Sequence, residues 1–474
     1  MATPSDSTLP APAFRARSSA YLIGIIVCVI LMSGLLFGYD QGVISGALSG
    51  IKRALGLSPL LIEVVTSWVT LGALFGSLAA GELADRIGRK KTVLTAAVLF
   101  ILGALIQASA PHTAVLVAGR LVVGFGVGVA AVAAPLYGSE TAQATWRGRL
   151  VSAYQMAITI GIFLAYLVNG ALSDGADWRM MLGLAAVPGI LLALFALAAP
   201  ESPRWLIKQG RPEAARNILA RLLNKDDCQA ELNEIENALR LEAGAVSWRE
   251  VFKPIYRKPL AIGIGLAVFQ QVTGINAIIY YANPIFAASG FATPEAQAAA
   301  TTWGIGATNV LSTLIAIAFI DRIGRVPLLL AGLIGMGASL ATVGLAFQFF
   351  EAPGDDATYG ATITVVALVI FIASFAFSLG PVVWTVINEV FPSRVRSRGV
   401  AISTAVNWAA AFVVSEFFLS LVQVLGRPFT FWLFALLCLV GWIWIYRKVP
   451  ETKGRSLEEI EQLWHDPSVN TVRP

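Results

Sequence analysis

One acidic residue, Asp40, lies inside a long run of apolar residues. From Ala20 to Leu48 the run reads AYLIGIIVCVILMSGLLFGYDQGVISGAL and contains no other charge. A second apolar run contains a lone arginine, Arg120. A charge at membrane depth is by default functional and needs a partner, so we predict that these two residues pair. Burial raises the pKa of a carboxyl group and a nearby guanidinium lowers it, so such a pair could take up and release a proton. The alternative is a static buried ion pair.

Glu416, in the stretch VVSEFFLS, is a third charge within an apolar segment. It matches no motif that we can name. The sequence alone assigns it no role.

Neutral amides and tryptophans also recur inside the apolar segments. An amide both donates and accepts hydrogen bonds, which suits a ligand rich in hydroxyl groups, and aromatic rings suit its C–H faces. An amide buried without a partner is costly, so these groups need something to bond. The alternative is that they join packed helices to one another. The candidates are Gln155, Gln270, Gln271, Asn276, Asn309, Trp384, Asn407 and Trp408.

Gln270 and Asn276 do not share one face of a regular helix. Gly274 lies between them and Pro284 follows, so we predict a bend that brings them together.

The composition indicates an all-α membrane protein. Of the 474 residues 57% are hydrophobic and only 13% are charged, whereas soluble domains hold roughly a quarter charged residues. The apolar residues form blocks of about twenty, long enough for helices that cross a bilayer. Twelve such blocks are predicted, beginning near Tyr21, Ile62, Thr92, Thr113, Leu150, Met180, Leu260, Ala299, Val326, Ala361, Gly399 and Pro428.

An even number of spans places both termini on one side of the membrane. Nearly all of the 34 Lys and Arg residues fall on that side. Those on the other side are Lys52, Arg53, Arg179 and Arg427. The positive-inside rule therefore predicts that both termini are cytoplasmic.

The longest loop, residues 201–258, divides six spans from six. Apolar residues recur in it at helical spacing, which predicts short amphipathic helices, with a solvated linker as the alternative. The predicted organisation is a cytoplasmic tail at 1–20, a six-helix bundle at 21–200, a cytoplasmic linker at 201–258, a second six-helix bundle at 259–447 and a cytoplasmic tail at 448–474.

The two halves repeat the same charged motifs in the same order. DRIGRKK at 85–91 returns as DRIGRVP at 321–327, and PESPRWL at 200–206 is echoed by PETKGRSL at 450–457. SETAQATWRGR at 139–149 and NEVFPSRVRSR at 388–398 each place a glutamate seven residues before an arginine. Parallel repeats of six spans are the plan of major facilitator transporters, with the substrate held between the halves.

Recurring opposite charges at helix ends can link neighbouring helices in one state of a transport cycle, so we predict a cytoplasmic gate. Simple positive-inside anchors are the alternative. The predicted gate residues are Asp85, Arg86, Arg89, Glu140, Arg147, Glu201, Arg204, Asp321, Arg322, Arg325, Glu389, Arg396, Glu451 and Arg455.

Over nearly its whole length the chain resembles the sugar porter family of the major facilitator superfamily, and within it the proton-coupled symporters. The resemblance rests on GYDQGVISGA, the two DRIGR motifs, GRLVVGFGVG at 119–128, PESPRWL, FQQVTGINAIIYYA at 269–282 and GPVVWTVINEVFPSRVRSRG at 380–399. It implies sugar contacts for Gln155, Gln270, Gln271, Asn276, Asn309, Trp384 and Asn407, with Phe37 and Tyr280 lining the pocket.

In proton-coupled sugar porters an acid occupies the position of Asp40 and an arginine that of Arg120. The resemblance therefore implies import of a hexose or pentose by proton symport, with Asp40 as proton acceptor and Arg120 modulating it. Facilitative uniport of a sugar or polyol, with Asp40 structural, is the alternative, and a sensor on a transporter fold is a further one. Some relatives carry a second glutamine where this chain has Ile162, so the sugar stays open.

Other function classes find no support in the residues. The two histidines, His112 and His465, lie in a loop and a tail, and no nucleophile with a base is evident. The three cysteines have neither metal nor disulfide spacing. The glycines at 124–128 favour close helix packing over a nucleotide cradle. We expect no enzyme activity, metal, organic cofactor or nucleic acid, and a monomer in the plasma membrane, which is the inner membrane in a bacterium. The expected partners are a monosaccharide, protons and the lipid bilayer.

Overall fold

The structure, a computed structural model, describes residues 12–141, 144–173, 175, 177–223, 225–242, 248–350, 356–392, 394–455 and 459–460. The outer parts of both predicted tails lie outside these residues.

The first half of the chain forms a bundle of six spans. Its helices are α1 (Pro12–Leu55), α2 (Pro59–Ile87), α3 (Arg89–Ala108), α4 (Thr113–Thr141), α5 (Ala144–Ala171), α6 (Trp178–Gly183) and α7 (Ala186–Ala198). The last two together make the sixth span.

The second half repeats this arrangement with more interruptions. Its helices are α11 (Arg257–Val272), α12 (Ile275–Tyr280), α13 (Ala282–Ala288), α14 (Pro294–Ala299), η3 (Ala300–Ala307), α15 (Thr308–Ile323), α16 (Arg325–Phe349), α17 (Asp356–Phe377), α18 (Leu379–Val390), α19 (Arg396–Leu425) and α20 (Arg427–Lys448).

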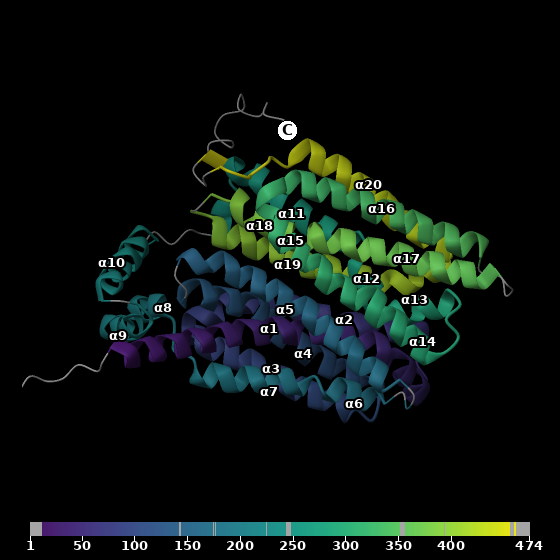
Figure 1. Cartoon of the computed structure of the whole chain (residues 1–474), viewed down its shortest axis with the longest axis horizontal. Helices are drawn as coiled ribbons and strands as arrows, with labels where there is room; N and C mark the ends of the chain where they lie inside the picture. Colours follow the sequence, from purple (N-terminus) through teal and green to yellow (C-terminus); the bar gives the residue numbers. More distant parts are fainter. Residues whose placement is uncertain are drawn as a thin grey trace, which may run out of the picture.

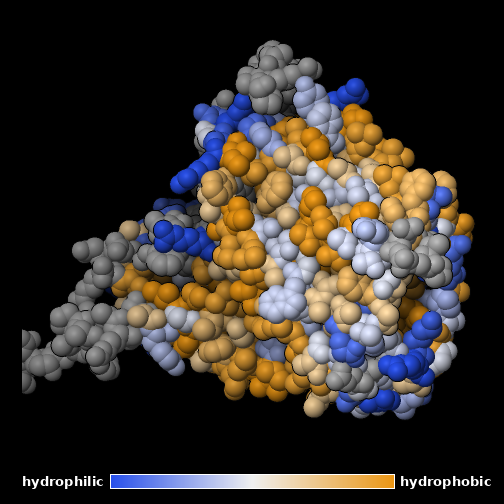
Figure 2. All heavy atoms as spheres, turned by 45° about the vertical axis from the view of Figure 1, so that its right-hand side comes forward, coloured by the Kyte–Doolittle hydropathy of each residue, from blue (hydrophilic) through white to orange (hydrophobic). Residues whose placement is uncertain are grey.

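Twelve stretches of the described chain are long and apolar enough to cross a membrane, which confirms the predicted count. The largest difference in position is at the seventh, predicted from Leu260 and observed from Pro254. Figure 1 shows the two halves as neighbouring layers of long helices. In Figure 2 hydrophobic residues spread over the flank of the bundle, with hydrophilic residues gathered toward its ends. This is the surface expected of a protein whose flank faces lipid.

Short helices between the halves define one end of the bundle. They are α8 (Pro203–Lys208), α9 (Pro212–Leu222), α10 (Lys225–Glu242), η1 (Trp248–Phe252) and η2 (Pro254–Tyr256). Leu219, Leu232 and Ile235 are buried in a small core of their own, so α9 and α10 pack apolar residues against each other. We call the end of the bundle where α8, α9 and α10 lie the linker end, and the end where α6 and α14 lie the far end (Figure 1).

Proline and glycine explain where the long helices break. Pro381 lacks an amide hydrogen, and its ring clashes with the carbonyl of Phe377, four residues earlier. Helix α17 ends at Phe377. Pro284 stands in the same relation to Tyr280, where α12 ends. Gly88 and Gly324 have φ of 95° and 111°, which lets a single residue separate α2 from α3 and α15 from α16.

Candidate functional site

Asp40 and Arg120 form a buried ion pair in the first half. One guanidinium nitrogen of Arg120, on α4, lies 2.8 Å from a carboxylate oxygen of Asp40, on α1. The Arg120 side chain is 0% exposed and that of Asp40 is 5% exposed. Arg120 also donates to the α2 carbonyls of Val65 and Thr66, at 3.0 and 3.3 Å. The predicted pairing is therefore present, and it ties three helices together.

Glycines bring these helices close enough for the pair to form. A Cβ added at Gly38 would lie 1.9 Å from the carbonyl oxygen of Ile158 on α5, and one added at Gly124 would lie 2.0 Å from that of Val69 on α2. Small residues allow such close backbone approach between membrane helices. The glycine-rich stretch at 124–128 therefore packs helices, as predicted.

Five amide side chains form one hydrogen-bonded network between the halves, named here the amide cluster. All five are buried, and they are Gln41, Gln270, Gln271, Asn276 and Asn407. Gln41 donates to Asn276 at 3.4 Å, and Asn276 donates to Gln271 at 2.8 Å. Gln271 donates to Asn407 at 3.2 Å, and Asn407 donates to Gln270 at 2.7 Å.

A break in the seventh span assembles this cluster. Helix α11 ends at Val272, Gly274 adopts φ of 93°, and α12 begins at Ile275. The bend lets Gln271, before the glycine, accept a hydrogen bond from Asn276 after it. The predicted bend is thus observed, although Asn276 contacts Gln271 directly and reaches Gln270 only through it.

Aromatic side chains border the amide cluster. The rings of Phe37 on α1 and Trp408 on α19 lie 5.4 Å apart between their centroids. Tyr280, 1% exposed, lies on α12, four residues after Asn276. It shares this short helix with Asn276, a member of the amide cluster.

The sequence interpretation missed Gln41. The residue follows Asp40 directly, and it entered the interpretation only as part of the motif around the acid. The signal was present, because Gln41 is itself an amide in an apolar run.

Three predicted sugar contacts lie outside the amide cluster. Gln155 on α5 is half-buried, Asn309 on α15 is buried, and the Trp384 side chain on α18 is half-buried. Within the part of the chain that the structure describes, neither amide makes a side-chain hydrogen bond to the cluster. Their predicted sugar contacts stay predictions.

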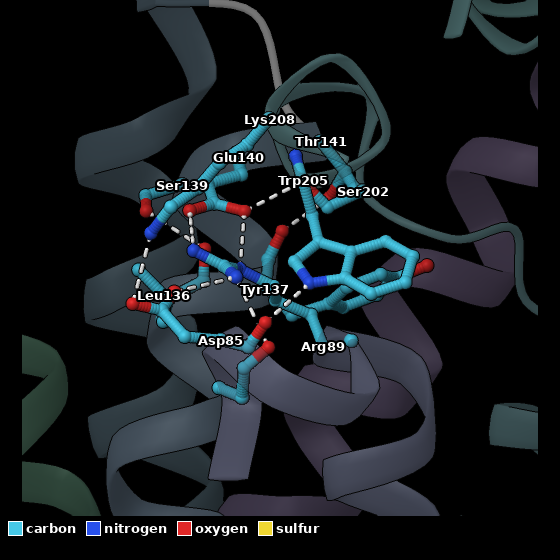
Figure 3. A network of polar contacts seen from close by, with 12 residues as sticks. Asp85, Arg89, Leu136, Tyr137, Ser139, Glu140, Thr141, Ser202, Trp205 and Lys208 are labelled. Atoms are coloured by element: carbon cyan, nitrogen blue, oxygen red, sulfur yellow. Dashed lines mark hydrogen bonds and ion pairs between the residues drawn. The ribbon is translucent and has the colours of Figure 1, made fainter. Parts of the chain in front are cut away.

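At the linker end of the first half, charged groups link α2, α3, α4 and α8 (Figure 3). Arg89 donates to Glu140 at 2.8 Å and to Asp85 at 3.0 Å. Lys208 on α8 lies 2.9 Å from Asp85. The carboxylate of Glu201 accepts the backbone N–H groups of Arg89 and Lys90, at 2.9 and 3.1 Å, and so caps the start of α3.

The second half repeats this geometry. Arg325 donates to Glu389 at 3.2 Å, matching Arg89 and Glu140. The carboxylate of Glu451 accepts the N–H groups of Arg325 and Val326, at 3.0 and 2.9 Å, and caps α16 as Glu201 caps α3. The sequence repeat is thus a repeat of contacts.

For the other predicted gate residues, the gate role stays a prediction. Arg86 pairs with Glu82, one turn away on its own exposed helix face. Arg322 lies over the ring of Phe319 on its own helix, at 5.8 Å. Arg396 donates to the Phe391 carbonyl at 3.1 Å, and Arg455 closes a backbone turn with Thr452. Arg204 lies in α8. The side chains of Arg147 and Asp321 lie outside the described residues.

The halves contact each other toward the far end. The Ser45 hydroxyl on α1 accepts the N–H of Asn283 on α13 at 3.0 Å, and Tyr166 on α5 donates to the Ile279 carbonyl at 3.0 Å. At the linker end, the matched pairs Arg89–Glu140 and Arg325–Glu389 each lie within one half. Hydrogen bonds therefore join the two halves at the far end.

Comparisons with known proteins agree with this geometry. Residues 26–464 match the family described as sugar (and other) transporter. The arabinose-proton symporter of Bacillus subtilis is 36% identical over 98% of this chain and 99% of its own. The galactose-proton symporter of Escherichia coli K12 is 38% identical, over 94% and 96%. The solved structure of the proton:xylose symporter XylE, of the major facilitator superfamily and bound to 6-bromo-6-deoxy-D-glucose, is 30% identical, with a TM-score of 0.79 over 94% of this chain and 100% of that one.

Proposed function

This chain belongs to the sugar transporter family of the major facilitator superfamily, and we propose that it imports a monosaccharide together with protons. Members of this family are transporters rather than enzymes, and twelve apolar helices make the chain a multi-pass membrane protein. The observation that carries the proposal is the buried Asp40–Arg120 pair, whose Asp40 directly precedes Gln41 of the amide cluster on α1.

The amide cluster is the proposed sugar site. Its amides bond to one another, so each already has a donor or acceptor that a sugar hydroxyl could replace. Gln41 comes from the first half and the other members from the second, so a sugar bound there touches both halves. Phe37 and Trp408 supply apolar faces for its C–H bonds.

The ion pair is the proposed proton site. Protonation of Asp40 removes its charge and weakens the hydrogen bond from Arg120, which leaves Arg120 held by the α2 carbonyls alone. Helices α1 and α4 are then less firmly joined, and the halves can rock about the sugar. Release of the proton from Asp40 on the other side of the membrane restores the ion pair.

We place the linker end in the cytoplasm, where the Lys and Arg residues gather. The membrane is then the plasma membrane, or the inner membrane in a bacterium. The coupling ion is the proton, and the linker-end charge clusters act as the gate on that side.

Uptake into proteoliposomes tests the proposal. With an inward proton gradient, we expect the parent protein to accumulate labelled sugar and to take up protons when sugar is added. Asp40→Asn should exchange sugar across the membrane without accumulating it, because the amide cannot carry the proton. Asp177→Asn is the matched control, since Asp177 caps α6 at the far end, away from the pair.

Facilitative uniport, with a structural Asp40–Arg120 pair, is the second candidate. The three hydrogen bonds that hold Arg120 in place favour such a structural role. Full proton-coupled accumulation by Asp40→Asn would show that the pair is structural and would reject our assignment. Absence of accumulation in the parent protein, with sugar exchange intact, would establish uniport.

A further inference from the structure

Helices α2 and α19 carry a reciprocal pair of contacts between the halves. The carboxylate of Glu63, on α2, accepts the Ser420 N–H at 2.6 Å and its hydroxyl at 2.7 Å. In the opposite sense, the carboxylate of Glu416, on α19, accepts the hydroxyl of Ser67 on α2. Each helix thus supplies one glutamate and one serine.

The spacing of these residues explains the reciprocity. Glu63 and Ser67 are four residues apart, as are Glu416 and Ser420, so each pair lies on one face of its helix. Helix α2 runs from the far end toward the linker end, and α19 runs the opposite way (Figure 1). In this antiparallel arrangement the glutamate of each helix faces the serine of the other.

The two carboxylates depend on these hydrogen bonds. The Glu63 residue is 1% exposed and Ser67 is 0% exposed, whereas Glu416 and Ser420 are half-buried. In the part of the chain that the structure describes, neither carboxylate forms a salt bridge with Lys or Arg. A buried carboxylate without a cation needs hydrogen-bond donors, so α2 and α19 can separate here only if water replaces the serines.

The same turn of α2 also accepts hydrogen bonds from Arg120. The guanidinium donates to the carbonyls of Val65 and Thr66, which lie between Glu63 and Ser67. One turn of α2 therefore connects the Asp40–Arg120 pair to the opposite half.

We propose that Glu63–Ser420 and Glu416–Ser67 form a clasp that closes the far end of the transport path, and that Arg120 links this clasp to Asp40 through α2. The proposal rests on the proposed function. It assigns a role to Glu416, which the sequence left without one, and to Glu63, which lies at the edge of the second span.

Distance measurements between spin labels test the clasp. The labels are attached at Leu60→Cys and Val424→Cys, at exposed far-end positions of α2 and α19, in a chain whose native Cys28, Cys228 and Cys438 are replaced by alanine. In lipid nanodiscs, Ser67→Ala with Ser420→Ala should raise the ratio of long to short distances about tenfold, because hydrogen bonds to both carboxylates are lost.

Two control variants remove hydroxyls from the same helices outside the clasp. Among the described residues, the hydroxyls of Ser77 on α2 and Thr404 on α19 donate within their own helices, to the carbonyls of Leu74 and Val400. Ser77→Ala and Thr404→Ala should leave the distances as in the parent protein. If the double serine variant shows the same distance distribution as the parent protein, the proposal is overturned. If the double variant does not fold, Ser420→Ala alone is measured, and an unchanged distance distribution in that variant overturns the proposal.

The link to the ion pair has its own readout. Asp40→Asn in the parent chain should lengthen the distances between the two labels. In the double serine variant it should lengthen them little further, because both changes act on the same turn of α2. Equal and additive shifts would reject the link. If sugar uptake proves uncoupled while the serine variants still change the distances, the proton role of Asp40 fails and the clasp stands.

Discussion

Asp40 and Arg120 illustrate how much single residues in a sequence can reveal. A charge in a long apolar run is costly, so its presence pointed to a partner, and the structure places the two groups 2.8 Å apart. Gln41 and Glu63 escaped notice for opposite reasons. Gln41 stood beside a more conspicuous acid, and Glu63 stood at the edge of a span, where a charge carries no such penalty.

Gln271 provides the test of whether the amide cluster binds sugar or only joins helices. We expect Gln271→Ala to raise the KM for sugar about tenfold, since hydrogen bonds to ligand are lost and partner amides are left unpaired. KM is measured by sugar exchange in proteoliposomes, which needs no proton gradient.

Gln107 is the matched control for this change. It is a buried glutamine in the first half that donates to the Gly119 carbonyl at 3.4 Å, away from the cluster. Gln107→Ala should lower the thermal stability and leave KM unchanged. If Gln271→Ala behaved in the same way, the cluster would be a helix contact and not a sugar site.

At the scale of elements, local chemistry explains why the helices lie where they do. The apolar blocks predicted the spans, and Gly274 predicted the break in the seventh. The break in the tenth span went unpredicted, although Pro381 gives a physical reason for it in the lost hydrogen bond and the clash four residues back. Which proline breaks its helix depends on tertiary packing, since Pro135 lies inside the continuous α4.

Close packing of α4 on α2 should make Gly124 intolerant of even one methyl group. In Gly124→Ala the new Cβ would overlap the Val69 carbonyl, so the helices must part, at a cost of about 1–3 kcal/mol in unfolding free energy. Gly81→Ala on α2 is the control, because no atom lies within 4 Å of its added Cβ and alanine favours helix. Thermal unfolding in detergent should show Gly124→Ala less stable than the parent and Gly81→Ala at least as stable. Equal stabilities would contradict the packing argument.

Across the whole molecule, the repeat in the sequence predicted which contacts would recur. Glu201 and Glu451 cap equivalent helices, and Arg89–Glu140 has its counterpart in Arg325–Glu389. The conformational state could not be predicted in this way. A transporter must form at least two states from one sequence, and the motifs are common to all of them.

This symmetry predicts that neutralising the gate has the same effect in either half. Glu140→Gln and Glu389→Gln each weaken a charge-assisted hydrogen bond to an arginine, so each should slow sugar exchange about tenfold. Sugar affinity, measured by equilibrium binding, should stay near that of the parent because the amide cluster is untouched. Arg86→Gln is the control, since the salt bridge that Arg86 makes among the described residues is to Glu82 on its own exposed helix face. Glu140 is the more buried of the two glutamates, with 7% of its side chain exposed against 24% for Glu389, so any difference should make Glu140→Gln the slower variant. A normal rate in one variant beside a slow rate in the other would show that the repeated contacts do not share a role.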